Sequence, residues 1–310
     1  MYHFIVNPGS RSKYSTNLWS SLEDILKSRN IIYRAYLTEY AGHATEYARS
    51  IEAEYRSSGS SDPLMIVIVG GDGTANEVIN GLVSYQNLIL GIIPSGSGND
   101  LAHSLGLPSD PFQALEIVLA RKKLRSVDHG LLHYFDGTAA HRFDVSAGLG
   151  YDAAVCYDVQ HSPLKKKLNR LRLGKLTYII IAVKNFFSYK PVNAKITVDG
   201  TEKHIKLLFA AAMLGKYEGG GLKMAPQACL DDRLLSVCVI EAFAKWKFFY
   251  LLPSLLFGKH VKFKEVTVYD CASFEIQCDT PTILHTDGEY GGTHAHVKFT
   301  CTPEQIQVIC

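Results

Sequence analysis

Three glycine-rich segments in the N-terminal part of the chain each follow a short apolar run. They are Asn7-Pro8-Gly9-Ser10, Gly70-Gly71-Asp72-Gly73-Thr74 and Pro94-Ser95-Gly96-Ser97-Gly98-Asn99-Asp100. Glycines let backbone N–H groups approach a phosphate, and the N-terminus of a following helix adds a favourable dipole. An aspartate inside such a loop suits a Mg²⁺ ion that bridges carboxylate and phosphate oxygens. One such segment could equally be a plain turn, but three at matching strand ends favour a phosphate site.

The elements that carry these loops alternate between strand and helix patterns. We expect strands at 3–6, 31–37, 64–69 and 88–93, with helices at 18–26, 43–56 and 76–83 between them. Continuous apolar runs such as 64–69 are typical of central parallel strands that are buried on both faces. The pattern predicts an α/β domain with a doubly wound parallel sheet, whose ligands bind at the carboxyl ends of the strands.

The pattern changes near residue 128. Short strand-like runs separated by turn residues follow at 142–147, 194–198, 205–213, 234–240, 264–269, 273–278 and 296–301, with helical insertions at 163–189 and 243–258. Such runs predict a mainly antiparallel, β-sandwich-like domain. We therefore divide the chain into an α/β domain, 1–128, and a β-rich domain, 129–310, whose last residues could pack back on the first.

Composition limits the class of protein. The 310 residues are 47% hydrophobic, which excludes a disordered chain, and the formal net charge of +2 argues against a dedicated nucleic-acid binder. The N-terminus does not resemble a secretory signal and no apolar run is long enough to span a membrane, so we expect a cytoplasmic protein.

Two basic stretches contain interleaved apolar residues. Residues 165–190 carry eight Lys and Arg and no Asp or Glu, and residues 243–264 combine five lysines with aromatic side chains. Basic groups beside an apolar face fit an anionic membrane surface. The alternative is a core-packing helix with a solvated basic edge. We expect transient, peripheral contact with a membrane through both stretches, and an oligomer is compatible with the sequence.

The sequence of residues 69–81, VGGDGTANEVING, resembles the nucleotide loop of the diacylglycerol kinase catalytic-domain family. This family includes bacterial soluble diacylglycerol and other lipid kinases, and sphingosine and ceramide kinases. The order and spacing of further motifs agree: Ile5-Val6-Asn7-Pro8, GSGND at 96–100, GGG at 219–221, Ala225-Pro226 and DGEYGG at 287–292. The resemblance covers essentially the whole chain, whereas GGDG alone also occurs in NAD kinases and phosphofructokinases.

The resemblance implies an NAD kinase/diacylglycerol kinase-like fold that uses ATP and Mg²⁺, with residues 1–128 as the nucleotide-binding domain and residues 129–310 as the lipid-substrate domain. The implied ATP-binding residues are Asn7, Pro8, Gly9, Ser10, Thr38, Gly71, Asp72, Gly73, Thr74, Asn76, Glu77, Gly96, Ser97, Asn99 and Asp100. Asp72 would join a water-linked Mg²⁺ network at the phosphates. Glu289 matches the family's general base for the lipid hydroxyl, although Asp287-Gly288 is also a strong hairpin-turn signal.

A structural Mg²⁺ site is implied at Leu230-Asp231-Asp232-Arg233-Leu234. By this resemblance Asp232 would bind the ion together with the carbonyl oxygens of Cys229 and Leu234. Arg233 stands where the family usually has Gly, which adds a cation and a Cβ. The alternative is a surface turn capped by an aspartate.

The expected function is an ATP-dependent lipid kinase that converts diacylglycerol to phosphatidic acid. The alternatives are a kinase for phosphatidylglycerol or a sphingoid lipid, an NAD kinase, and a catalytically silent nucleotide- or lipid-binding regulator. Departures from the family pattern at His103, Asp144 and Leu214 bear on the acceptor site. The Asp-Gly-Glu and Gly-Gly-Gly motifs argue against an NAD kinase, and intact Asp72 and Glu289 argue against a silent regulator, which Arg233, Asp144 and Leu214 keep open.

Overall fold

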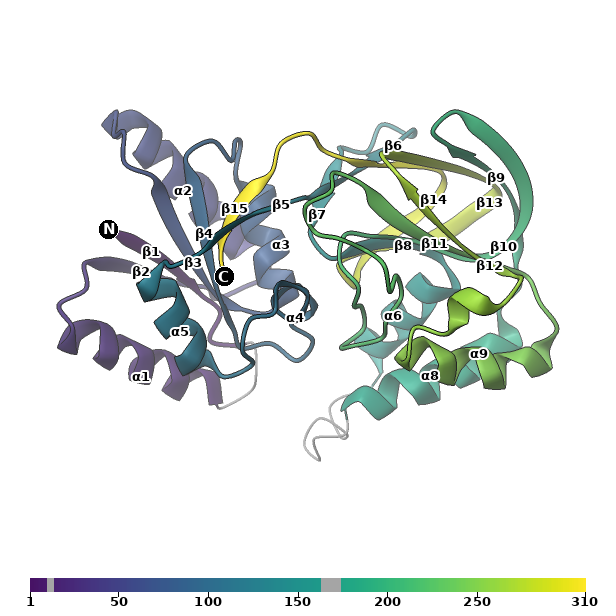
Figure 1. Ribbon diagram of the computed structural model, residues 1–310, viewed down its shortest axis with the longest axis horizontal. Helices are drawn as coiled ribbons and strands as arrows, with labels where there is room; N and C mark the ends of the chain where they lie inside the picture. Colours follow the sequence, from purple (N-terminus) through teal and green to yellow (C-terminus); the bar gives the residue numbers. More distant parts are fainter. Residues whose placement is uncertain (10–13, 163–173) are drawn as a thin grey trace. The chain divides into compact units, whose positions relative to one another are not determined.

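The structure is a computed structural model that describes residues 1–9, 14–162 and 174–310 (Figure 1). It divides into two compact units, which are Met1–Asp128 with Pro303–Cys310, and His129–Thr302. The chain thus leaves the first unit after Asp128 and returns to it with its last strand. Ser10 and the part of the basic stretch at 165–173 lie outside the described residues.

The first unit is built on a six-stranded sheet. Its strands lie in the order β2 (Tyr33–Leu37), β1 (Tyr2–Val6), β3 (Leu64–Gly70), β4 (Leu88–Pro94), β15 (Ile306–Ile309) and β5 (Leu124–Val127). All neighbours pair in parallel except β15 and β5. Because β2 and β3 flank β1, the strand order reverses at β1, and such a switch point is where open α/β sheets bind ligands. The predicted α/β fold class is confirmed.

Helices cover both faces of this sheet (Figure 1). On one face, α1 (Tyr14–Ser28) and α5 (Pro111–Ala120) place side chains such as Leu22 and Leu115 in one cluster with Phe4 and Val67. On the other face, α2 (His43–Ser58) packs against α3 (Asp72–Gly81), and the short α4 (Asp100–Leu105) follows β4. The helix expected at 76–83 in fact begins at Asp72, because the extended Gly71 ends the strand and the Asp-Gly-Thr segment forms the first helical turn.

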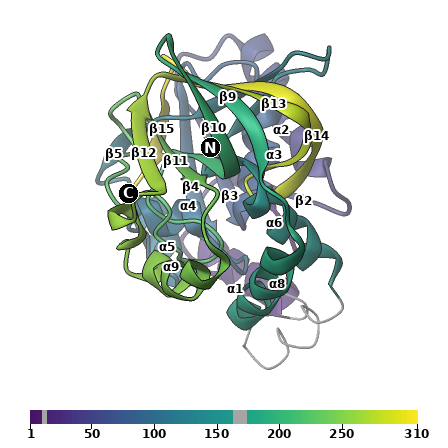
Figure 2. The same cartoon turned by 90° about the vertical axis from the view of Figure 1, so that its right-hand side faces the viewer.

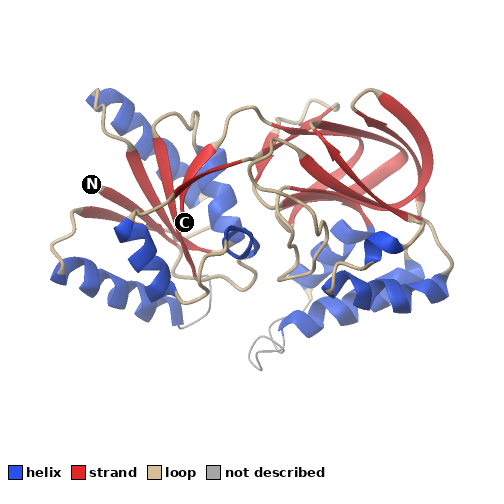
Figure 3. Ribbon diagram, viewed as in Figure 1, coloured by secondary structure: helices blue, strands red, loops and turns tan. Residues whose placement is uncertain are grey.

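The described part of the second unit contains nine strands, paired antiparallel. They are drawn in red in Figure 3. They are β6 (Gly130–Tyr134), β7 (His141–Phe143), β8 (Ser146–Gly150), β9 (Val192–Val198), β10 (Thr201–Met213), β11 (Leu235–Glu241), β12 (Val266–Cys271), β13 (Ser273–Thr286) and β14 (Glu289–Cys301). The run expected at 142–147 is split between β7 and β8. The runs expected at 273–278 and 296–301 are the outer ends of one long hairpin, β13–β14.

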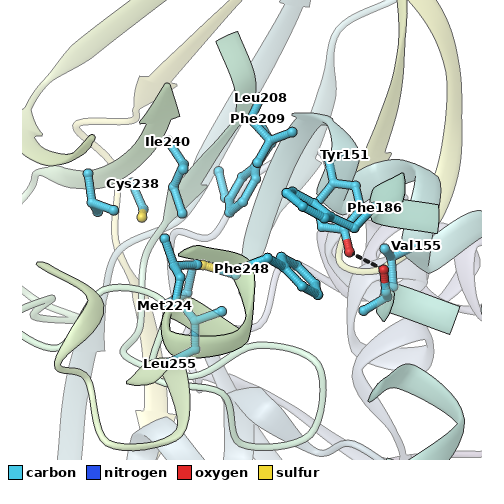
Figure 4. Packing of buried hydrophobic residues seen from close by; sticks show 14 of the residues in the cluster. Tyr151, Val155, Phe186, Leu208, Phe209, Met224, Cys238, Ile240, Phe248 and Leu255 are labelled. Carbon is cyan, nitrogen blue, oxygen red and sulfur yellow. Dashed lines mark hydrogen bonds between the residues drawn. The ribbon is translucent and has the colours of Figure 1, made fainter. Parts of the chain in front are cut away.

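Helices of the second unit lie together on one side of its sheet (Figure 2). They are α6 (Tyr151–His161), α8 (Gly174–Ser188), the 3₁₀ turn η1 (Lys245–Lys247), α9 (Phe248–Leu256) and the 3₁₀ turn η2 (His260–Lys262). Their apolar sides share a core with β10 and β11, in which the rings of Phe186 and Phe248 stack with centroids 3.9 Å apart (Figure 4). Within the described part of the chain, no helix is long and apolar enough to cross a membrane.

Candidate functional site

The loops that follow four parallel strands meet at one edge of the first unit's sheet. Asn7 follows β1 and donates its backbone N–H to Val69 of β3, over 2.9 Å. Thr38 follows β2 and donates to Val6 over 2.8 Å, and Ser95 follows β4 and donates to Gly70 over 2.8 Å. The structure therefore brings the predicted nucleotide loops together at the switch point.

The first and second loops are tied by the side chain of Asn7. Its Nδ2 donates to Oγ1 of the buried Thr74 (3.0 Å), and its Oδ1 accepts the backbone N–H of Gly9 (3.0 Å). Pro8 and Gly73 are half-buried and Gly9 is exposed, so this part of the edge is open to solvent.

Asp72 links the second loop to the third. Its carboxylate accepts the backbone N–H groups of Asp100 (3.1 Å) and Leu101 (3.0 Å), which begin α4. Both carboxylate oxygens thus have a structural partner. The sequence did not predict this role for Asp72, and the predicted role in a Mg²⁺ network stays a prediction.

Glycines make the contact between these two loops possible. A Cβ on Gly96 would lie 2.6 Å from the Cα of Gly71, a distance that no real side chain tolerates. Asn99 holds the turn in a left-handed conformation (φ 56°), and its Oδ1 accepts the N–H of Gly96 over 2.9 Å. Ser97, at the tip, is exposed. Contacts within and between the second and third loops therefore determine their conformation.

Two of the predicted nucleotide contacts serve the packing of helices. Glu77 Oε2 accepts the backbone N–H of Ala44 in the first turn of α2 (3.1 Å). Asn76 is buried and accepts from Nδ2 of Asn80 within α3. Both lie further along α3 than the loop amides.

In the second unit, Asp287 and Gly288 form the turn of the β13–β14 hairpin. Their φ angles of 49° and 82° are those of a two-residue type I′ turn, which confirms the expected turn. The Asp287 carboxylate accepts the backbone N–H groups of Asp144 (3.0 Å) and Val145 (2.9 Å), which separate β7 from β8, and of Ser146 (2.9 Å), which begins β8. These bonds fix the turn to the segment that separates β7 from β8.

Glu289, the predicted base, is the first residue of β14 and is exposed. Gln160, in the last turn of α6, donates its Nε2 to Glu289 Oε2 (2.9 Å) and to the carbonyl oxygen of Gly288 (2.7 Å). A solvent-accessible carboxylate held in this way can accept a proton from a hydroxyl group.

Behind the turn lies a buried network centred on His285. Its Nε2 is 2.8 Å from Asp152 Oδ2 and 3.4 Å from Glu218 Oε1, and Ser146 donates its hydroxyl to the same Glu218 oxygen. Burial lowers the pKa of His285, whereas the hydrogen bond to Asp152 and the nearby carboxylates raise it, so that the net pKa is about 9. Gly148 makes room for the network, since a Cβ there would lie 2.4 Å from His285 Nε2.

Comparisons with known proteins agree with both units. Residues 1–132 match the diacylglycerol kinase catalytic domain, and residues 145–310 match the YegS C-terminal NAD kinase beta sandwich-like domain. A diacylglycerol kinase of Staphylococcus saprophyticus is 31% identical over 83% of this chain and 78% of its own. The YtlR protein of Bacillus subtilis is 29% identical over 99% of this chain and 98% of its own.

The chain belongs to the diacylglycerol kinase family of lipid kinases. The predicted resemblance is thereby confirmed.

Solved structures share the fold of this lipid kinase. A diacylglycerol kinase from Bacillus anthracis superposes with a TM-score of 0.70 at 19% identity, over 99% of this chain and 96% of its own. An NAD kinase from Archaeoglobus fulgidus in complex with ATP gives a TM-score of 0.53 at 11% identity, over 100% of this chain and 94% of its own.

The predicted metal loop of the lipid kinase is an exposed turn. Asp232 Oδ1 accepts the backbone N–H of Leu234 (3.0 Å), and the Cys229 thiol donates to Asp231 Oδ1 (2.9 Å). Arg233 adopts φ 61°, in the left-handed region that favours the glycine usual at this position. An oxygen-only ligand set suits Mg²⁺, but the Asx turn already engages Oδ1 of Asp232. The metal assignment stays a prediction.

Sequence reasoning missed several residues of this lipid kinase site. Gln160 and Asp152 lie on α6, a helix that was not predicted, although Tyr151, Val155 and Val159 recur at a spacing of four residues and are buried. Glu218 lies directly before the GGG motif and His285 lies two residues before the DGEYGG motif, but neither residue is part of a motif. Cys156 joins Asp152 and His285 in a group whose ligand atoms all lie within 4.8 Å of one another.

Proposed function

We propose that this lipid kinase transfers the γ-phosphoryl group of ATP to the hydroxyl of diacylglycerol and forms phosphatidic acid. The observation that carries the proposal is the close contact between the second and third loops, at Gly71 and Gly96. Asp72 stabilises this contact at the carboxyl ends of β3 and β4 by accepting hydrogen bonds from the start of α4. The diacylglycerol kinase relatives, which are 28–31% identical to this chain, favour diacylglycerol among lipid acceptors.

The first unit would hold the nucleotide. Backbone N–H groups in the first turn of α3, a ten-residue helix, can donate to phosphate oxygens, and the helix dipole favours their negative charge. Mg²⁺, when bound, would neutralise part of the phosphate charge. Asn7 and Thr74 would keep the first two loops in place through their mutual hydrogen bond.

The second unit would supply the base. Attack by a primary hydroxyl on the γ-phosphorus forms the new P–O bond and breaks the bond to the β-phosphate oxygen, so ADP leaves with that electron pair. The hydroxyl proton passes to the Glu289 carboxylate. Glu289 is exposed and can reach such a hydroxyl, whereas Asp287 is committed to three backbone N–H groups.

The test is transfer of radiolabelled γ-phosphate from ATP to a panel of lipids in mixed micelles. We expect labelled phosphatidic acid with the wild type, and with Glu289→Gln a loss of at least about 100-fold in kcat with nucleotide affinity retained. Faster labelling of phosphatidylglycerol or a sphingoid base would replace the acceptor. Nucleotide binding without labelling of any lipid would indicate a silent regulator, and normal turnover of the variant would exclude Glu289 as the base.

We also propose that the enzyme reaches its lipid through a surface formed by η1, α9 and η2. Phe248, Leu251 and Leu255 pack into the core, as the core-packing interpretation requires. Four aromatic side chains nevertheless remain more than half exposed: Trp246 (63%), Phe249 (57%), Tyr250 (66%) and Phe257 (69%).

Charge indicates the partner of this aromatic surface. Residues 243–264 contain five lysines and no Asp or Glu, which fits an anionic bilayer better than a protein partner of mixed charge. Lys247 is paired with Glu265 (2.5 Å), while Lys245 donates to the carbonyl of Phe187 (2.9 Å) and joins α8 to the surface. Aromatic rings flanked by lysines are suited to the interface of lipid and water.

A further inference from the structure

We propose that Gln160 is a positioning residue for phosphoryl transfer, because it orients the Glu289 carboxylate so that one oxygen is held and the other faces the acceptor hydroxyl. The inference rests on the proposed function, in which Glu289 takes the hydroxyl proton. Gln160 lies outside all of the motifs by which the sequence resembles the family.

The contacts of Gln160 determine the orientation of its amide. The carbonyl oxygen of Gly288 (2.7 Å) and Oε2 of Glu289 (2.9 Å) can only accept hydrogen bonds, so the NH₂ group must face both of them. Each of its two N–H bonds then has one partner. One bond fixes the backbone of the turn and the other fixes the carboxylate, which sets the position of the reacting oxygen relative to the hairpin.

Glu289 needs such a partner because it is exposed. An exposed glutamate samples several rotamers, and each productive encounter with a hydroxyl must wait for the right one. The hydrogen bond to Oε2 restricts this freedom and leaves Oε1 on the other side of the carboxylate.

Helix α6 is a rigid support for Gln160. Tyr151, Val155 and Val159 of this helix are buried in the core of the second unit, and the Tyr151 hydroxyl donates to the carbonyl of Ala182 on α8 (2.5 Å). Near the end of α6, the ring of Tyr157 lies against that of Tyr290, with centroids 4.9 Å apart.

The same helix also holds the hairpin from its other end. Asp152, in the first turn of α6, binds His285, which precedes the turn on β13. Gln160, in the last turn of α6, donates hydrogen bonds to Gly288 and Glu289, on the other side of the hairpin turn. Helix α6 therefore contacts the chain on both sides of the Asp287-Gly288 turn, and its hydrogen bond from Gln160 reaches the proposed base itself.

The test compares Gln160→Met and Gln160→Glu with wild type in the transfer assay, as kcat and KM for ATP over a range of pH. Gln160→Met keeps the length but loses both hydrogen bonds, and we expect kcat to fall about tenfold with KM for ATP unchanged. In Gln160→Met, the part of the pH–rate profile where kcat falls toward acid pH (the acid limb) should move to higher pH, because the carboxylate has lost a hydrogen-bond donor. Gln160→Glu should move it further, since it brings a second carboxylate against Glu289.

The matched control is Asn185→Leu. Asn185 on α8 donates its Nδ2 to Asp158 Oδ2 on α6 (2.8 Å), so this variant removes an amide hydrogen bond from the same helix without touching the turn. We expect its acid limb to coincide with that of wild type. The other titratable groups described around the turn are Asp144, Asp152, Tyr157, His161, Glu218, His285, Asp287 and Tyr290, and no variant changes them.

The outcomes separate this inference from the function on which it rests. A wild type that labels no lipid, or a fully active Glu289→Gln, overturns both. If Glu289→Gln is inactive while both Gln160 variants keep the wild-type kcat and acid limb, the function stands and the positioning role is wrong. A loss of kcat with an unmoved acid limb would likewise reduce Gln160 to a structural role.

Discussion

Asp287 and Ser146 exchange hydrogen bonds in both directions. The Asp287 carboxylate accepts the Ser146 N–H over 2.9 Å, and the Ser146 carbonyl accepts the Asp287 N–H over 2.7 Å. The same carboxylate accepts the N–H groups of Asp144 and Val145. These bonds explain why the strand-like run at 142–147 does not form one strand: its middle residues turn their N–H groups toward Asp287 instead of a neighbouring strand.

Asp287→Asn should destabilise the second unit. The substitution removes the charge that three N–H groups share, and we expect the free energy of unfolding to fall by about 2 kcal/mol. Turnover should fall as well, because Glu289 lies two residues away. Urea unfolding followed by far-UV circular dichroism measures the first effect, and the transfer assay measures the second.

The control for this prediction is Asp279→Asn, on strand β13 of the same hairpin. Asp279 accepts one exposed hydrogen bond from Asn193 (3.0 Å), so its loss should change stability by less than about 0.5 kcal/mol. Equal urea midpoints for the two variants would show that the three backbone contacts of Asp287 contribute little.

Asp72→Asn should destabilise the first unit even without nucleotide or metal. One acceptor oxygen and the charge are lost at the start of α4, where Asp72 binds Asp100 and Leu101, and we expect a cost of about 1 kcal/mol. The measurement is urea unfolding in EDTA, with and without added Mg²⁺. A cost that is seen only with Mg²⁺ would show that Asp72 acts through the metal and not through the backbone of α4.

Much of the first unit could be predicted because its signals are local. Strands β1, β3 and β4 are mostly apolar runs that each end at a glycine-rich loop, so the centre of the sheet and the meeting of the loops follow from the chain itself. The sequence also places Asp72 in a loop. It does not indicate that this carboxylate caps the next loop, because that contact joins residues 28 positions apart.

The second unit was harder to predict because its decisive contacts are remote. Asp287 meets Asp144 across 143 positions, and Ser146 meets Glu218 across 72. The inner half of the β13–β14 hairpin escaped prediction because the pairing shifts between Gln277 and Thr282, which breaks the alternation of the pattern. Helix α6 follows directly on β8, so its buried residues continue a strand signal.

Stability should fall in alkaline solution as His285 loses its proton. The pKa of His285 is raised to about 9, against about 6.5 in the unfolded chain, so its charge stabilises the folded state fully below about pH 6.5 and the contribution is lost as pH rises through 9. We expect a loss of about 3 kcal/mol across this interval. The N–H of Gly288, 3.3 Å from Nδ1, favours the neutral ring, but the two carboxylates outweigh this single long contact.

The measurement is the free energy of unfolding in urea between pH 6 and 10, for wild type and His285→Gln. The variant should be less stable at pH 6.5 and show a flatter profile in the alkaline range. Parallel profiles for the two proteins would mean that His285 is already neutral at pH 7 and that its network is held by uncharged hydrogen bonds.

Binding to anionic vesicles should depend on the exposed rings of the aromatic surface. Replacing Trp246 and Phe257 together by Ser removes two side chains that are 63% and 69% exposed, and we expect vesicle affinity to fall at least about tenfold. Phe112→Ser is the matched control, since Phe112 is an exposed ring (42%) at the start of α5 in the first unit. The assay is sedimentation with vesicles of phosphatidylglycerol and phosphatidylcholine, at low and high salt. Because lysines flank the rings, binding should weaken as salt screens their charge. Equal binding of the wild type, the double variant and Phe112→Ser would place the membrane contact elsewhere on the enzyme.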